Sequence, residues 1–141
     1  MSIIALGDKM HKKKASIVIG LGFGDEGKGL TTHFLSLQSP NSLVIRFNGG
    51  QQAGHTVRTK QGKNHIFSNF GAGTFSQIPT YWSQFCTFSP SSLLKEYEML
   101  QQQIQHLPIL WVDKLCPVTT HYDILFNRLS EQYRGLQKHG S

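Results

Sequence analysis

The sequence predicts an α/β fold with a largely parallel sheet, and two patterns along the chain carry that prediction. Short β-branched or aliphatic runs alternate with longer segments in which apolar residues recur at helical spacing. A glycine-rich loop joins the first such run to the first helical segment, as in doubly wound sheets. The 141 residues, 38% of them hydrophobic, are enough for one domain with a core of its own.

The first predicted elements are a strand and a helix. The β-branched run at residues 16–19 ends in glycines, which is typical of a buried strand. After the glycines, Leu30, Phe34 and Leu37 recur at helical spacing. Residues 40–42 (Pro-Asn-Ser) break the chain, so we expect the helix to end before them.

A second strand is predicted at residues 43–47, where aliphatic and aromatic side chains again predominate. It leads into a polar, glycine-rich loop at residues 48–56 that has almost no core-forming side chains. A hairpin is predicted next, because residues 56–59 and 65–68 flank a glycine-containing turn.

The second half of the chain repeats the alternation of helix and strand. Ser89 followed by Pro90 is typical of a helix N-cap with proline in the first turn. This helix should end before Pro108 and be followed by a strand at residues 109–112, and a last helix is predicted at residues 121–138. The apolar stripes of the two helices comprise Leu93, Tyr97, Leu100 and Ile104, and Leu125, Leu129, Tyr133 and Leu136. Because the chain stops directly after the last helix, we expect an incomplete α/β domain whose final stripe is exposed.

Basic residues outnumber acidic ones by 14 to 8, and the formal charge of +6 favours anionic partners such as nucleotides. Their one cluster lies within residues 1–15 and comprises Lys9, His11, Lys12, Lys13 and Lys14. No aromatic side chains alternate with these lysines, so the stacking surface of a single-strand binding site is missing. We interpret residues 1–15 as a solvated basic extension and expect no nucleic-acid partner; an arm that contacts nucleic acid is the alternative.

Composition and patterning also exclude several classes of protein. The composition excludes a collagen, an acidic disordered tail and a disulfide-dense mini-protein. No apolar run reaches the roughly 18 residues of a membrane span, and the N-terminus has its apolar residues before its charges, the reverse of a signal peptide. Only Cys86 and Cys116 are present, so we expect buried, reduced thiols and a cytoplasmic location, with a single disulfide as the alternative.

The chemistry is concentrated in the glycine-rich segment at residues 20–29, GLGFGDEGKG. Glycines leave backbone N–H groups uncovered, and the following helix adds its own unpaired N–H groups and its positive dipole end. Together they predict a phosphate cradle, in which Lys28 supplies a positive charge for the β and γ phosphate oxygens.

Two nucleotide-binding motifs overlap in this segment. Residues 22–28 fit G-x-x-x-x-G-K, but Gly29 stands where a P-loop has the Ser or Thr that binds magnesium. The same residues fit G-x-G-x-x-G, which in a dinucleotide fold requires an acid at the end of the second strand. That strand ends Ile-Arg-Phe-Asn, so NAD is disfavoured, and Arg46 leaves NADP as an alternative.

A carboxylate and an imidazole extend the predicted site. Asp25 lies inside the loop, where its oxygen can replace the missing hydroxyl ligand of magnesium; capping of the helix start is the alternative role. His55 follows the second glycine-rich loop, which also comes after a strand. Because ligands of parallel sheets bind at the carboxyl ends of strands, we expect Asp25, Lys28 and His55 to converge on one site.

Two segments together resemble the N-terminal part of the adenylosuccinate synthetase family: GDEGKG at residues 24–29 and VIRFNGGQQAGHTV at residues 44–57. Weaker similarity extends the match to roughly residues 17–141. The family joins IMP to L-aspartate with hydrolysis of GTP, through a 6-phosphoryl intermediate, in purine nucleotide biosynthesis. The resemblance implies that residues 16–141 are the N-terminal portion of a GTP-binding, P-loop NTPase-like domain.

The resemblance also implies a role for each matching residue. Asp25 matches the general base and a Mg²⁺ ligand, His55 matches the general acid, and Lys28 is the third catalytic residue. Gly54 matches a carbonyl ligand of Mg²⁺. The GTP phosphates would contact Gly24, Asp25, Glu26, Gly27, Lys28, Gly29, Leu30, Gly54, His55 and Thr56. IMP would contact Asp25, Lys28, Gln52, Ala53, Gly54 and His55.

The chain departs from the family in two respects, and both leave alternatives open. Gln52 stands where the family usually has Asn, at a position that contacts the purine, so a phage-type relative acting on dGMP is an alternative. Family members are also much longer, so the chain would carry only the phosphate-transfer half of the site. A non-catalytic nucleotide-binding module or degenerate paralogue is therefore a second alternative, and a nicotinamide-dependent oxidoreductase is a third. The family is typically dimeric, which implies a homodimer.

Overall fold

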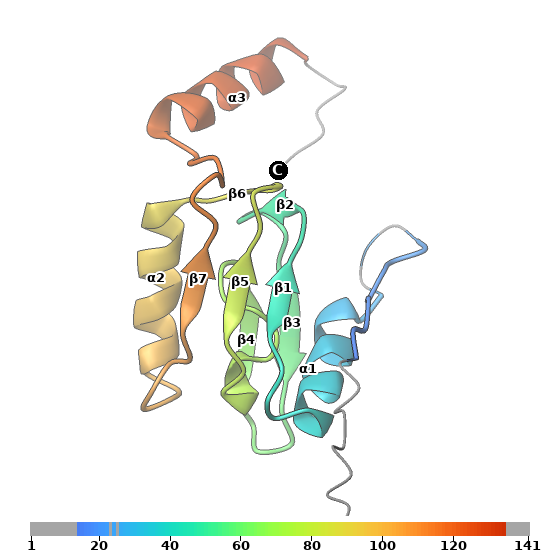
Figure 1. The fold of residues 1–141 in the computed structure, drawn as a ribbon. Coiled ribbons are helices and arrows are strands. Elements are labelled where there is room, and N and C mark those ends of the chain that lie inside the picture. The colour runs from blue at the N-terminus through green and yellow to red at the C-terminus, as the bar shows by residue number, and fades with distance from the viewer. Residues whose placement is uncertain (1–13, 23, 25, 135–141) are drawn as a thin grey trace, which may run out of the picture.

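A three-stranded parallel sheet forms the centre of the molecule in a computed structural model, which describes residues 14–22, 24 and 26–134. Its strands, in spatial order, are β1 (Val44–Arg46), β5 (Thr80–Trp82) and β7 (Leu110–Val112) (Figure 1). The predicted α/β class with a largely parallel sheet is therefore confirmed.

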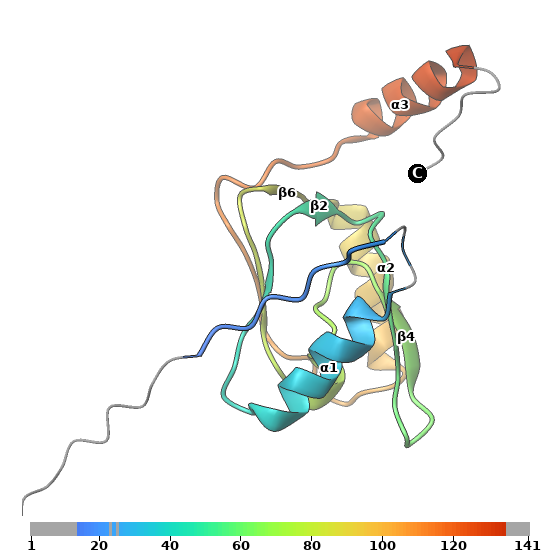
Figure 2. The same ribbon diagram turned by 90° about the vertical axis from the view of Figure 1, so that its right-hand side faces the viewer.

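Helices α1 (Lys28–Gln38) and α2 (Pro90–Gln101) and the antiparallel hairpin of β3 (His55–Arg58) and β4 (Asn64–Phe67) form a layer on one side of this sheet (Figure 2). The other helical elements are α3 (His121–Tyr133) and a 3-10 turn η1 (Thr74–Ser76). The remaining strands are the short parallel pair β2 (Gly49–Gly50) and β6 (Cys86–Thr87). With the sheet seen from its edge, α1, α2 and the hairpin all lie on one side, while α3 projects away from the body (Figure 2).

The core fills the space between the sheet and this layer. Val57 and Phe67 of the hairpin pack against Leu100 of α2, and all three side chains are fully buried. A second cluster surrounds Trp82 with Cys86 and Cys116, whose thiols are both buried and free. The predicted buried, reduced cysteines are confirmed.

The opposite face of the sheet is open. Ile45, Tyr81 and Trp111 are neighbours in register across the three parallel strands. Ile45 is 58% exposed and Trp111 is 46% exposed. Parallel sheets normally bury both faces, so this apolar row is an unusual feature of the described part of the chain.

The strand predicted at residues 16–19 is wrong. Residues 14–20 form an extended segment outside any strand, and Ile17 and Ile19 are largely exposed. The pattern of β-branched residues is suitable for a strand, but within the described residues β1 pairs only with β5, so no ladder partner fixes the segment.

The helix predicted after the glycine loop is confirmed, but α1 does not bury its apolar stripe. Leu30, Phe34 and Leu37 are each more than half exposed. The buried face consists instead of Gly29, His33 and Ser36, at the spacing of one side of a helix. Small and polar residues allow α1 to lie close to the hairpin and η1.

The later helices follow their predicted start signals more closely than their predicted ends. Ser89 caps α2, its hydroxyl accepting from Ser92 N at 3.4 Å. The helix ends at Gln101, before Pro108 as predicted, so Ile104 of the predicted stripe lies beyond it. Thr120 caps α3, which buries none of its side chains, so the predicted stripe is exposed at its described members Leu125, Leu129 and Tyr133. The predicted end of this helix, residues 135–138, lies outside the described residues.

Strands β2, β5 and β6 were not predicted, and β2 lies within the predicted loop at residues 48–56. Each has no more than three residues, and β5 directly follows Pro79, so no such strand shows a periodic pattern of its own.

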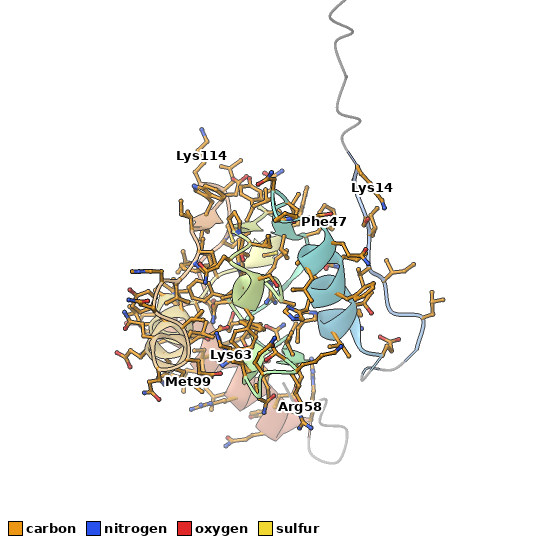
Figure 3. All side chains as sticks on the ribbon, turned by 90° about the horizontal axis from the view of Figure 1, so that it is seen from below. Lys14, Phe47, Arg58, Lys63, Met99 and Lys114 are labelled. Atoms are coloured by element: carbon orange, nitrogen blue, oxygen red, sulfur yellow. The ribbon has the colours of Figure 1, made fainter. Side chains whose placement is uncertain are left out.

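No helix among residues 14–134 is long and apolar enough to cross a membrane. Lys14, Arg58 and Lys114, the described basic residues labelled at the periphery of Figure 3, lie at different edges of the molecule.

Candidate functional site

The first glycine-rich loop bends sharply before α1. Gly24 has a φ of 101° and Gly27 a φ of 73°, both in the left-handed region that glycine adopts without strain. Gly27 is the N-cap of α1, and among the described residues no side chain accepts a hydrogen bond from the first N–H groups of the helix. These N–H groups therefore face the loop without such a partner. Such a helix start is a ready anion site. Asp25, the predicted base and metal ligand, lies outside the described residues.

The carboxylate of Glu26 lies in the same loop. It accepts hydrogen bonds from the Gly22 N–H and from the Lys28 ammonium. The Lys28 hydrogen bond, followed by that of Gly22, lowers the pKa of Glu26 below its ordinary value. Glu26 thus occupies a position that suits an anionic ligand.

The second loop is held by a buried arginine at the end of β1. Arg46 Nη2 donates to the carbonyl oxygens of Ala53 at 3.1 Å and Gly50 at 3.4 Å. Ala53 N donates to Gly50 O at 3.0 Å and closes the turn between them. Gln52, the predicted purine contact, lies exposed at the tip of this turn.

The two loops meet where α1 touches the start of β3. A Cβ added at Gly29 would lie 2.9 Å from both His55 Cβ and Thr56 O. Only glycine allows this approach, because real Cβ contacts are almost never that short. Lys28 and Gly54 directly precede the two touching residues, so the structure brings the predicted lysine, histidine and second loop together.

His55 is half-buried beside two positive charges. Burial is the main cause that lowers the pKa of its imidazole, and the charges of Arg46 and Lys28 lower it further. A backbone hydrogen bond involving Phe67 acts in the opposite direction. The imidazole is therefore neutral at neutral pH and can both donate and accept one hydrogen bond.

Some predicted site features are not gathered here. The side chain of Leu30 is 53% exposed, so only its backbone can serve a phosphate. Residues 14–22, 24 and 26–134 contain no group of three His, Cys, Asp or Glu side chains that could hold a metal ion. A hollow of about 560 Å³ lies beside α2 and β7, lined by Tyr97 and His106 among others, and includes neither loop.

Comparison with known proteins gives this site a context. The family model described as adenylosuccinate synthetase matches residues 17–141. The chain belongs to the adenylosuccinate synthetase family. The adenylosuccinate synthetase of Borrelia duttonii is 36% identical over 124 residues, which cover 88% of this chain and 28% of that protein. Adenylosuccinate synthetase 1 of Photorhabdus laumondii is 35% identical over 131 residues, with the same coverage of each chain.

Solved structures of synthetases share the fold. The fully ligated adenylosuccinate synthetase of Plasmodium falciparum superposes with a TM-score of 0.63 at 22% identity, over 79% of this chain and 25% of that chain. The succinoaminodeoxyadenylate synthetase of cyanophage S-2L, bound to dGMP and dATP, gives 0.62 at 23% identity, over 81% and 31%. The chain spans little more than a quarter of the curated relatives it matches.

Sequence reasoning missed the part that Arg46 plays. The sequence suggests Arg46 only as a contact for an NADP phosphate, but its guanidinium is buried and directed at the backbone of its own loop. Together with the family match, this removes the nicotinamide alternative. A charge within the otherwise apolar run at residues 43–47 is the only signal in the sequence, and it indicates an arginine that needs a partner without showing which partner it finds.

Proposed function

We propose that this chain carries the phosphate-transfer half of a GTP-dependent ligase that joins IMP to L-aspartate. The observation that supports it most is the contact between Gly29 and His55, because it places the N-terminus of α1 beside the second glycine-rich loop. One anion can then meet backbone N–H groups from the first loop, the Lys28 ammonium and the His55 imidazole. Membership of the synthetase family supports the same assignment.

Each residue has a distinct task in this proposal. Lys28 and the N–H groups at the start of α1 hold the β and γ phosphate oxygens, with charge neutralisation and positioning supplying most of the rate enhancement. His55 donates a hydrogen bond to the purine 6-oxygen as it receives the phosphoryl group. Asp25 removes the proton from purine N1, which makes the 6-oxygen nucleophilic.

A hard cation fits the oxygen donors that this site offers. Gly54 is exposed between the second loop and β3, and its carbonyl oxygen, with the carboxylate of Asp25, is the kind of ligand that Mg²⁺ takes alongside substrate phosphates. When bound, Mg²⁺ would neutralise phosphate charge. We further assign residues 1–15 to a basic extension and residues 16–141 to the N-terminal portion of the enzyme, acting in the cytoplasm and as a homodimer.

Consumption of GTP tests the ligase proposal directly. Purified chain should release phosphate from GTP only when IMP and L-aspartate are both present, and dGMP in place of IMP tests the phage-type alternative. In a complete enzyme, Asp25→Ala should abolish turnover with a much smaller loss of nucleotide affinity. Near-normal kcat in that variant would contradict the base assignment.

A nucleotide-binding module without turnover is the second candidate, because the chain spans only 28% of its relatives. Calorimetry separates the two, since the module binds GTP but consumes none under any combination of substrates. Lys28→Met should remove most GTP binding, whereas Lys60→Met, at an exposed position of the β3–β4 turn, should leave it unchanged. Equal binding by both variants would argue against a phosphate site at α1.

A further inference from the structure

Arg46 is a charged residue in a place where charges are rarely found. It is the last residue of β1 and only 8% of its surface is exposed. Within the described residues it forms no ion pair with a carboxylate, and its Nη1 atom is buried without a hydrogen-bond partner. Burying a guanidinium under these conditions is costly, so its presence calls for a compensating role.

The contacts that Arg46 does make are directed at two targets. Its Nη2 donates to the carbonyl oxygens of Ala53 and Gly50, at the two ends of the turn in the second loop. Its guanidinium carbon lies 4.8 Å from the ring centroid of Trp82. Trp82 is fully buried and its indole N–H donates to Asn69 O at 2.6 Å, so this platform has a fixed orientation.

The backbone of Arg46 is fixed as well. Its carbonyl oxygen accepts from Ser83 N at 3.0 Å and from the Cys86 thiol at 3.1 Å. A side chain that starts from a fixed backbone and stacks on a fixed ring presents its donors in one place. A planar guanidinium can stack and donate at the same time, whereas the compact ammonium of lysine cannot reproduce both contacts.

We propose that Arg46 is a positioning residue that holds the turn at residues 50–53, and through it Gly54 and His55, in the arrangement that receives the nucleotide. The proposal rests on the function proposed above for this loop. Arg46 itself touches neither phosphate nor purine; it acts through the carbonyl groups of the turn.

The test compares two arginines of the same region. Arg46→Lys keeps the positive charge but loses the planar guanidinium that stacks on Trp82 and donates to the turn. Arg46→Met loses the charge as well. The matched controls, Arg58→Lys and Arg58→Met, change an exposed arginine at the end of β3 whose side chain points outward (Figure 3). Amide hydrogen exchange of each ¹⁵N-labelled chain and the Kd for MgGTP are measured.

The Ala53 amide, bonded to Gly50 O, reports the turn. We expect both Arg46 variants to lose about tenfold of its protection, the effect of removing a charge-assisted hydrogen bond, and to bind MgGTP about tenfold more weakly. Val57 and Phe67, in the core of the hairpin, should keep their protection in Arg46→Lys. Both Arg58 variants should match the wild type.

Two results would overturn the proposal. Wild-type protection of Ala53 in Arg46→Lys would show that the turn does not depend on the guanidinium. A simultaneous loss of protection at Ala53, Val57 and Phe67 would show that Arg46 stabilises the whole fold rather than the turn. If Arg46→Met does not fold, the exchange pattern of Arg46→Lys distinguishes the two roles. Failure of the wild type to bind MgGTP would contradict the proposed function, while the exchange data would still decide the role of Arg46 in the turn.

Discussion

Single residues decide whether the phosphate loop can receive an anion, and Glu26 is the first of them. Its carboxylate already accepts from Gly22 N and from Lys28, the two kinds of donor that a phosphate would use. A phosphate that approaches Lys28 therefore meets a carboxylate that already uses one of the three donors of the ammonium. This makes Glu26 an internal competitor as well as a predicted contact.

Replacing Glu26 by glutamine should strengthen the binding of phosphate-containing ligands. The amide keeps the shape of the side chain but removes the negative charge that pairs with Lys28. We expect Glu26→Gln to bind GTP several-fold more tightly in calorimetry, while Glu98→Gln, on an exposed face of α2, should bind like the wild type. Weaker binding by Glu26→Gln would mean that the carboxylate supports the loop rather than competing for it.

Gly29 is the second residue with a decisive position. An alanine there would place a methyl group 2.9 Å from His55 Cβ and Thr56 O, so α1 and β3 must separate. We expect Gly29→Ala to lower the free energy of unfolding by about 1–3 kcal/mol, the usual cost of overpacking, and to weaken GTP binding. Thr31→Ala, on the exposed side of α1, should destabilise far less when both are measured by urea denaturation. Equal stabilities would contradict the close contact.

At the scale of elements, α1 is fixed by a polar face, which makes its attachment sensitive to pH. His33 is buried on that face, and its Nδ1 lies 3.3 Å from Ser76 Oγ of η1. Burial lowers the pKa of His33, with a smaller opposing effect from an Ala72 backbone hydrogen bond. The unfolded chain therefore takes up its proton at a higher pH than the folded chain does.

The sign of the pH dependence follows from that shift. As the pH falls through about 6.5, the ordinary pKa of histidine, protonation of the unfolded chain should reduce the free energy of unfolding until the folded chain is also protonated. His33→Gln should flatten this fall between pH 7.5 and 5.5, measured by urea denaturation. Part of the fall should remain, because the pKa of His55 is lowered too. An unchanged slope in His33→Gln would exclude His33 as its source.

The predictability of these elements depended on whether their signals were local. The Ser89 cap, the glycine loop before α1 and the hairpin turn are short-range features, and all three appear where the sequence predicts them. The segment at residues 16–19 and strand β5 were misjudged, because pairing with a neighbour decides what a short β-branched run becomes. The buried face of α1 could not be predicted either. The helix packs through Gly29, which allows close approach to β3, and not through its apolar stripe.

The candidate site shows the same division. The grouping of the Lys28 and His55 loops was expected from strand ends of one sheet. Residues 14–20 form no strand, however, and the close contact of Gly29 with His55 and Thr56 brings the loops together instead. The fixation of the second loop by Arg46 could not be predicted, because it depends on Trp82, which lies in the unpredicted strand β5. The roles of Asp25, His55 and Lys28 in catalysis stay predictions.

At the scale of the whole molecule, the described residues give the sheet one layered face and one open apolar face (Figure 2). Ile45 and Trp111 occupy the open row of the sheet, and apolar patches of this kind favour association. We expect Ile45→Lys combined with Trp111→Lys to reduce concentration-dependent association in sedimentation velocity while leaving the thermal midpoint nearly unchanged. Val57→Lys, in the closed core, should unfold the chain. Loss of the fold in the double variant would contradict an open face.

Two glycine-rich loops, joined by the Gly29–His55 contact, should form one phosphate-binding site. Titration of the ¹⁵N-labelled chain with MgGTP, followed by amide chemical shifts, is the decisive measurement. Amides of residues 20–29 and of residues 49–56 should shift together and fit a single Kd. Shifts confined to one loop, or two loops that respond with different Kd values, would contradict it.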